Sequence, residues 1–222
     1  MVHIRFSKVL LWIISFLIVI LSLFVYAGFN GTPWEKHRQI QNMDSYLSKK
    51  YHTDFIMKKI DYNFLSETYQ VYSYPKGHPE LVFMVEQDAD ASAGYSDTFP
   101  KVFWESELSN HLKKTIKGLF PRLDDTTFTA KQIDERGEYF GPHIPTYKEI
   151  HESQLACSIT IFIKSKWEKV KQAAEIEKMK RLSHFLESVH FPVLVQITYY
   201  EKERNQNDKV FFITEEGRIV DK

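Results

Sequence analysis

The sequence predicts an α+β fold, with an N-terminal transmembrane helix followed by two small subdomains, each an antiparallel sheet with helices. The first supporting observation is a run of 21 residues without a charge, Val9–Phe29, which is long enough to span a membrane as a helix. The second is the pattern after this run, in which stripes of apolar residues at helical spacing alternate with paired strand-like segments rather than with single strands.

The apolar run is interpreted as a retained anchor. At ~1.5 Å of rise per residue, its 21 residues cover roughly 31 Å, about the thickness of a bilayer's hydrocarbon core. A cleaved secretory signal is the alternative, because Val25 and Ala27 fit the small-residue rule for a cut after Ala27, although the apolar region of a signal is usually only ~7–15 residues long. Arg5 and Lys8 predict a cytoplasmic N-terminus, so residues 1–30 form the cytoplasmic stub and anchor, and residues from about 31 onward lie outside the cytoplasm.

Composition narrows the classes of partner. The 222 residues include 29 basic and 29 acidic side chains, and no basic stripe with interleaved aromatic residues is present, so we expect no nucleic-acid partner. Cys157 is the single cysteine, which excludes an intrachain disulfide and a cysteine zinc site. This cysteine usage is compatible with an exported protein of a Gram-positive bacterium.

The first subdomain is expected over residues 31–121. Thr32 and Glu35 form a capping-box pattern around Pro33, which predicts a helix continuing to about Tyr51. Three strands are predicted: 56–64 from the alternation at its end, 68–74 from its β-branched and aromatic residues, and 81–86 as a central strand because it is apolar on both faces. The small, polar segment 89–98 is expected to be a loop, and a second helix runs from Pro100 to the stop at Gly118 and Pro121, with its apolar stripe at Trp104, Leu108, Leu112 and Ile116.

The second subdomain is expected over residues 122–222. Residues 126–133 form a weak strand pattern, 135–147 a loop, and 156–164 a strong strand with Cys157 in phase with three isoleucines. A second capping-box pattern, Ser165–Glu168, predicts the start of a long helix over about 166–189. The remaining strands are predicted at 193–200, 209–214 and 219–220.

The first half of the chain resembles a known family. The anchor, a helix ending in Ser48-Lys49-Lys50-Tyr51, and the segments FIMKKIDYNF, TYQVYSYP and LVFMVEQD are similar to uncharacterised YfjL-like membrane-anchored proteins of Bacillus-type bacteria, and more loosely to PepSY-like modules of one helix and three strands. The resemblance covers residues 1–120 best and rests on a pattern of hydrophobic residues. It implies an extracytoplasmic module and supplies no catalytic residues.

One acidic loop is a candidate for metal binding. Asp88–Gly94 begins like an EF-hand calcium loop, but the positions that need glycine and a bidentate glutamate hold Ala93 and Phe99. A solvated loop is therefore favoured over a calcium site. A looser cation site remains a weak hypothesis for Asp88, Asp90 and Asp97.

Two further candidates fail on spacing or phase. His151 and Glu152 begin an H-E-x-x-H zinc motif, but the fifth position is Leu155, so the second histidine ligand is missing. Cys157 would need a thiolate and a partner histidine to act as a nucleophile. Because it alternates in phase with the isoleucines of its strand, a buried, inert thiol is favoured.

Other charged and aromatic groups suggest surfaces rather than chemistry. The charged outer face of the long helix, from Glu168 to Arg181, is either solvated or a docking surface. The carboxylate pairs Asp124-Asp125 and Glu215-Glu216 are interpreted as solvated turns. Tyrosines that alternate in opposite phase suggest that one set faces outward from its sheet; the residues considered are Tyr69, Tyr72, Tyr74, Tyr199 and Tyr200.

These observations predict a non-enzymatic, membrane-tethered extracytoplasmic interaction module that contacts another envelope protein or a cell-wall component. No residue is assigned a catalytic, cofactor-binding or metal-binding role, and no cofactor is expected. The alternative is an envelope enzyme, metal-dependent or hydrolytic, in which histidines and carboxylates would converge in one deep pocket. A third hypothesis is a secreted protein, released by cleavage after Ala27.

Overall fold

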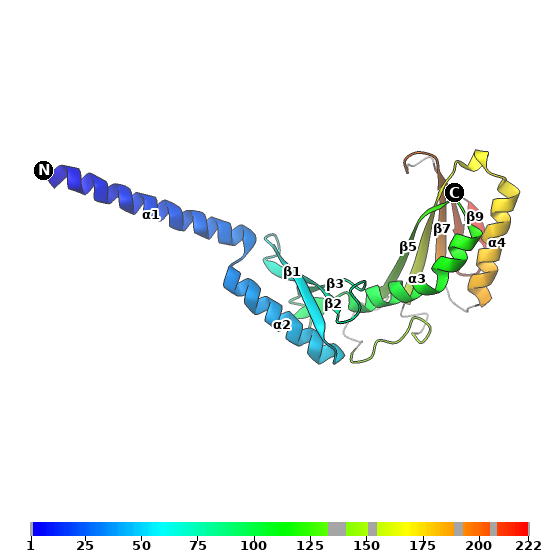
Figure 1. Ribbon diagram of the computed structural model, residues 1–222, viewed down its shortest axis with the longest axis horizontal. Helices are drawn as coiled ribbons and strands as arrows, with labels where there is room; N and C mark the ends of the chain where they lie inside the picture. The colour runs from blue at the N-terminus through cyan, green and yellow to red at the C-terminus, as the bar shows by residue number, and fades with distance from the viewer. Residues whose placement is uncertain (1, 133–140, 151–154, 189–192, 205–207, 222) are drawn as a thin grey trace. The chain divides into compact units, whose positions relative to one another are not determined.

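The computed structural model describes residues 2–132, 141–150, 155–188, 193–204 and 208–221 (Figure 1). Its internal contacts divide the chain into two compact units, a first unit of Met1–Thr98 and a second unit of Phe99–Lys222. The fold class is α+β, as predicted.

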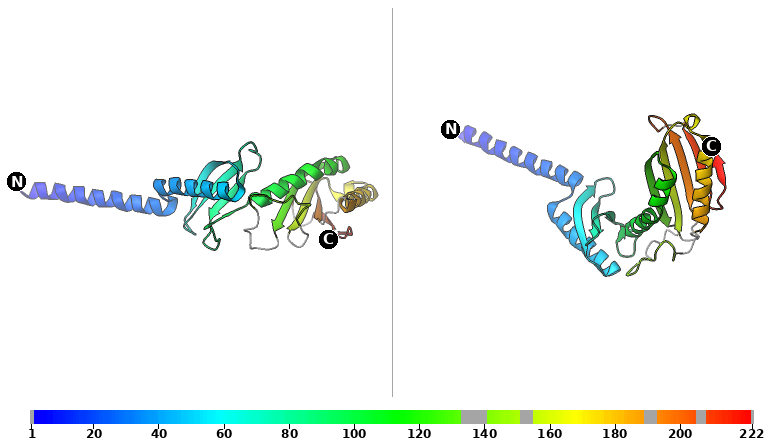
Figure 2. Two further views of the ribbon diagram at one scale, coloured as in Figure 1. Left: turned by 90° about the horizontal axis from the view of Figure 1, so that it is seen from below. Right: turned by 45° about the vertical axis from the view of Figure 1, so that its right-hand side comes forward.

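The first unit begins with two helices, α1 (Val2–Asn30) and α2 (Pro33–Tyr51). Within the described part of the chain, one helical segment is long and apolar enough to cross a membrane, and its apolar portion is α1, which carries exposed side chains along nearly its whole length from Val9. Thr32 caps α2 as predicted, because its hydroxyl accepts the Glu35 N–H at 3.4 Å, but the Thr32 N–H, which a capping box would give to Glu35, donates to the Tyr69 hydroxyl instead. α1 extends away from the sheet of this unit (Figures 1 and 2).

The sheet of the first unit has four antiparallel strands in sequence order. They are β1 (Phe55–Asn63), β2 (Thr68–Pro75), β3 (Phe83–Gln87) and β4 (Tyr95–Asp97). α2 packs on β1 and β2, and Met43 and Leu47 of this helix are fully buried together with Val71 and Val85 of the sheet. β4 lies inside the segment that the sequence predicted as loop, because a strand of three residues is too short to show alternation.

The second unit combines two helices with a five-stranded sheet. Its elements are α3 (Phe99–Leu119), β5 (Leu123–Gln132), β6 (Leu155–Lys164), η1 (Trp167–Lys169), α4 (Gln172–Ser188), β7 (Leu194–Tyr200), β8 (Lys209–Ile213) and β9 (Ile219–Asp221). The strands lie in sequence order, and β6 and β7 are parallel while the other pairs are antiparallel. The predicted antiparallel sheet is therefore wrong here: α4 carries the chain back to the starting end of β6, as a crossover between parallel strands requires.

α3 belongs to the second unit, whereas the sequence pattern grouped it with the first and placed the boundary after Pro121. The physical reason is that α3 packs along β5. The Ala130 N–H of β5 donates to the Glu105 carboxylate at 3.1 Å, and the Trp104 indole N–H donates to the Pro145 carbonyl at 2.8 Å. The apolar stripe predicted for this helix is buried in full.

α4 starts at Gln172, not at about residue 166 as the second capping-box pattern predicted. The segment instead forms the short 3-10 turn η1, after which Val170 is extended. Trp167 explains this difference, because its ring packs against Tyr199 and Phe211, with centroids 4.9 and 4.6 Å away. These tertiary contacts override a local helix-start signal. The buried residues of α4 include Leu182 and Leu186.

Candidate functional site at the anchor junction

The junction between α1 and α2 consists of Gly31 and Thr32. The Gly31 N–H donates to the Ala27 carbonyl at 2.8 Å, which closes the end of α1. Gly31 has φ of +68°, in the left-handed region that favours glycine. A Cβ at this position would overlap the Tyr69 hydroxyl and lie 2.8 Å from its Cζ atom, so both the backbone and the packing require glycine.

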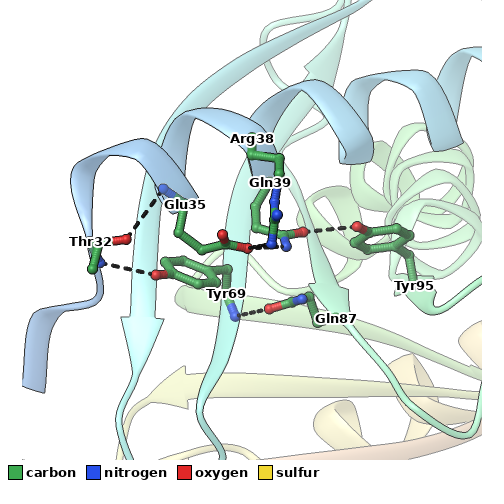
Figure 3. Close-up of polar contacts among 7 residues, drawn as sticks. All are labelled: Thr32, Glu35, Arg38, Gln39, Tyr69, Gln87 and Tyr95. Carbon is green, nitrogen blue, oxygen red and sulfur yellow. Dashed lines mark hydrogen bonds and ion pairs between the residues drawn. The ribbon is translucent and has the colours of Figure 1, made fainter. Parts of the chain in front are cut away.

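Tyr69 of β2 ties the junction to the sheet. Its hydroxyl accepts the Thr32 N–H at 3.2 Å, and its own backbone N–H donates to the Gln87 side-chain oxygen at 2.8 Å (Figure 3). The ring is buried and lies against Tyr62, with centroids 4.8 Å apart. The turn between the two helices is therefore held from β2 and β3 together.

A second set of polar contacts runs from the first turn of α2 to β4. The Glu35 carboxylate accepts hydrogen bonds from Arg38 Nη2 at 2.6 Å and Gln39 Nε2 at 2.7 Å. The buried Gln39 in turn accepts the Tyr95 hydroxyl at 2.8 Å (Figure 3). The hydrogen bonds from Gln39 and Arg38 hold the pKa of Glu35 below its usual value, so this carboxylate stays ionised at neutral pH.

Asp97 anchors the opposite end of α2. Its carboxylate has no exposed surface and accepts hydrogen bonds from Tyr46 at 2.9 Å, Lys50 at 2.8 Å and Tyr51 at 2.8 Å. Burial, followed by the negative charge of Asp97, raises the pKa of Tyr51, which keeps its hydroxyl protonated as a donor. Asp97 thus closes a buried ion pair and braces α2 against β4.

The cation site considered for Asp88, Asp90 and Asp97 is not assembled. Asp88 accepts the Asp90 backbone N–H at 3.0 Å in a local turn, while Asp97 is committed to α2. Across the described ranges, no three His, Cys, Asp or Glu side chains lie close enough to hold a metal ion. The polar contacts of the first unit therefore fix α2, and with it the end of α1, on the sheet.

The other sequence candidates lie in the second unit. His151 and Glu152 fall outside the described residues, and Leu155 is buried at the start of β6. Cys157 is buried, as its alternation predicted. Burial, with a smaller contribution from the Glu105 charge, raises the pKa of the Cys157 thiol to about 12.

Cys157 should therefore resist alkylation in the folded protein. At pH 8 its thiol stays protonated because the folded pKa is about 12, whereas the unfolded thiol titrates near ~8.5 and is partly ionised. We expect iodoacetamide to modify it only after unfolding in urea, as measured by mass spectrometry. As a control, a cysteine introduced at the exposed neighbouring position by Ala156→Cys should react with iodoacetamide under native conditions. Equal native rates at both positions would contradict the burial of Cys157.

Two hollows in the second unit are lined by paired charges. One, of about 460 Å³, is bordered by Trp167, Tyr199 and Tyr200; the other, of about 400 Å³, by Phe120, Ile163 and several basic side chains. Among their charged groups, Lys178 pairs with Glu175 at 2.7 Å, and Lys209 pairs with Asp221, which lies outside the lining, at 2.9 Å. The Tyr199 hydroxyl also donates to Glu175, at 2.9 Å.

The tyrosines considered in the sequence differ in burial. Tyr69, Tyr199 and Tyr200 are buried, whereas Tyr72 is exposed, so the outward-facing set in β2 is the one in phase with Tyr72.

The charged surface candidates form ion pairs. Asp124 and Asp125 lie in β5, not in a turn, and both pair with Arg204, at 3.4 and 3.5 Å. Glu216 does lie in a turn, where it pairs with Arg218 at 3.3 Å. On α4, Glu177 and Arg181 form an exposed pair at 3.9 Å.

A family model matches the first part of the chain. Residues 6–88 match the family model described as YfjL-like, N-terminal domain. The first part of the chain is similar to this YfjL-like domain. The expected resemblance to YfjL-like proteins is thereby confirmed for this part, and the match takes in α2 and the first three strands of the sheet. β4, Asp97 and the second unit lie beyond the YfjL-like region.

A comparison with solved structures gives one match of low structural similarity. The match is the structure of a DUF5037 family protein from Ruminococcus gnavus ATCC 29149, with 11% sequence identity, a TM-score of 0.43, and coverage of 72% of this chain and 74% of that chain. No curated protein matches the sequence.

The junction residues were not identified as a site from the sequence. The sequence does contain a signal for the turn at Gly31. A glycine in the short link between the apolar run and the capping box is typical of a helix end, where it often adopts the left-handed region. Tyr69 gave no such signal, because its contact with Thr32 joins residues 37 positions apart.

Proposed function

We propose that this chain is a single-pass membrane protein in which α1 anchors an extracytoplasmic, non-enzymatic interaction module. The observation that carries the proposal is the junction: an exposed apolar helix passes through two residues, Gly31 and Thr32, into a folded unit that binds both of them. In this proposal lipid covers α1, and Arg5 and Lys8 keep its N-terminal end in the cytoplasm.

A fixed junction suits recognition close to the membrane. A flexible linker would let a tethered module sample many orientations, whereas hydrogen bonds to Tyr69 and through Glu35 and Gln39 hold α2 in one orientation relative to the sheet. Such a module presents the same surface to its surroundings at a constant height. Another envelope protein or a cell-wall component is the partner that we propose for it.

An envelope enzyme has weaker support than an interaction module. Metal-dependent or hydrolytic chemistry needs histidines and carboxylates that converge in one pocket. The described linings of the two hollows in the second unit hold basic side chains, carboxylates and aromatic rings, and no histidine. We therefore favour an interaction module over an envelope enzyme.

Cross-linking in intact cells tests the proposal. The tagged full-length chain is compared with a chimera in which another anchor replaces residues 1–29, and with a truncated chain that lacks residues 31–222. We expect one reproducible cross-linked partner with the first two proteins and none with the truncated chain. A partner that persists without residues 31–222 would assign binding to the anchor, and absence of any partner would contradict the interaction proposal.

A further inference from the structure

The turn between β1 and β2 presents two large apolar side chains to solvent. Leu65 is 82% exposed and Phe64 is about half exposed. The turn itself is well formed, because Asn63 Oδ1 accepts the Leu65 N–H at 3.0 Å and the Ser66 and Thr68 hydroxyls hydrogen-bond at 2.7 Å. An ordered turn that displays its apolar residues outward is typical of a contact element rather than of a simple connection.

This turn lies beside the C-terminal end of α1 (Figures 1 and 2). The Phe64 ring packs on Phe29, the last residue of the uncharged run, with ring centroids 5.3 Å apart and the planes at 53°. The apolar surface of α1 therefore continues onto the turn. Whatever covers the end of α1 also reaches Phe64.

The depth of the turn follows from the length of α1. If Val9–Phe29 spans the hydrocarbon core, which takes roughly 31 Å of helix, Phe29 sits at its outer boundary. Phe64 is then within about one helical pitch of ~5.4 Å from that boundary. Aromatic and aliphatic side chains at this depth lie in the interface between headgroups and acyl chains. Trp34, 73% exposed and five residues after Phe29, adds an aromatic group near the same end of the anchor.

We propose that the β1–β2 turn enters the outer interface of the lipid bilayer next to α1, with Phe64 and Leu65 as the inserted side chains. The inference rests on the proposed anchoring by α1. Lipid is favoured over a protein partner because the turn is continuous with the exposed surface of α1, which lipid covers along its whole length in the anchored state. Such a contact adds a second point of attachment and sets the height of the first unit above the membrane.

The test places an environment-sensitive fluorophore on the full-length chain in nanodiscs of phosphatidylcholine and phosphatidylglycerol. The label is attached at Leu65→Cys, at Lys76→Cys in the exposed turn at the other end of β2, and at Phe16→Cys in the middle of α1. The unsubstituted chain measures background labelling, which is low because Cys157 is buried. Nitroxide lipids and aqueous iodide serve as the two quenchers.

We expect a blue-shifted emission at position 65 and several-fold stronger quenching by nitroxide lipid than at position 76, with the reverse order for iodide. Strong lipid quenching at position 16 together with an aqueous signal at position 65 would overturn the insertion of the turn and leave the anchor standing. An aqueous signal at position 16 would overturn the anchor itself, and the insertion of the turn with it.

Discussion

Replacing Asp97 by alanine should lower the free energy of unfolding of the first unit by about 3–5 kcal/mol, the cost expected when one member of a buried ion pair is removed. The Asp97 carboxylate has no exposed surface, and Lys50 is only 15% exposed. Removing the Asp97 carboxylate leaves the Lys50 ammonium and the hydroxyls of Tyr46 and Tyr51 without the acceptor that they share. The Lys50 ammonium, which still donates to the Tyr46 hydroxyl at 3.0 Å, would lose its counter-charge in a largely buried position, and this is the source of the large loss.

Hydrogen–deuterium exchange in urea measures this effect on the strands of the first unit separately from the second unit. The matched control is Asp54→Ala, which breaks the exposed Asp54–Lys76 pair at 3.4 Å and should cost less than about 1 kcal/mol. Equal small losses for both variants would contradict a bracing role for Asp97. Asp97→Asn should fall between them, because it keeps an acceptor but removes the charge.

Replacing Gly31 by alanine should disrupt the junction between α1 and α2. An alanine in the left-handed region costs roughly 1–2 kcal/mol, and overpacking against Tyr69 adds about 1–3 kcal/mol. The chain can relieve the overlap by moving Tyr69, which breaks the hydrogen bond from the Thr32 N–H to its hydroxyl. We expect the start of α2 to lose protection while α1 keeps its own.

Exchange rates of the backbone amides of Thr32, Glu35 and Lys36 check this prediction. Gly28→Ala is the matched control, since a Cβ on this helical glycine meets no atom within 4 Å, and it should leave the junction unchanged. Tyr69→Phe isolates the hydrogen bond, with an expected loss of about 1 kcal/mol. If Gly31→Ala and Gly28→Ala behave alike, the junction is not held as the structure indicates.

Local signals in the sequence predicted much of the fold. The uncharged run, the helix-start signal at Thr32, the β-branched and aromatic residues of β2 and the alternation in β6 each depend on neighbouring residues, and each element appears where it was expected. The start of α4 was predicted wrongly because Trp167 prefers its aromatic contacts to a helical turn. The parallel pairing of β6 and β7 also escaped prediction, since strand order and direction are set by long-range packing.

The candidate site was harder to predict, for the same physical reason. The donors that bind Asp97 lie 46 to 51 residues before it. In the sequence, Asp97 therefore cannot be distinguished from the other carboxylates of the acidic loop. Tyr69 likewise meets Thr32 only through the folded sheet. The sequence marks the start of α2 at Thr32, but not the side chains that hold it there.

Protease accessibility in intact spheroplasts tests the proposed anchoring most directly. The full-length chain carries one tag at each terminus. Protease is added to the intact spheroplasts first, and the membranes are then isolated, washed at alkaline pH and probed for both tags. Anchoring by α1 predicts that the chain stays in the membrane fraction, that protease removes the C-terminal tag from outside, and that the N-terminal tag survives until lysis. Protection of the C-terminal tag in intact spheroplasts, or release of a fragment cut after Ala27 into the medium, would contradict it.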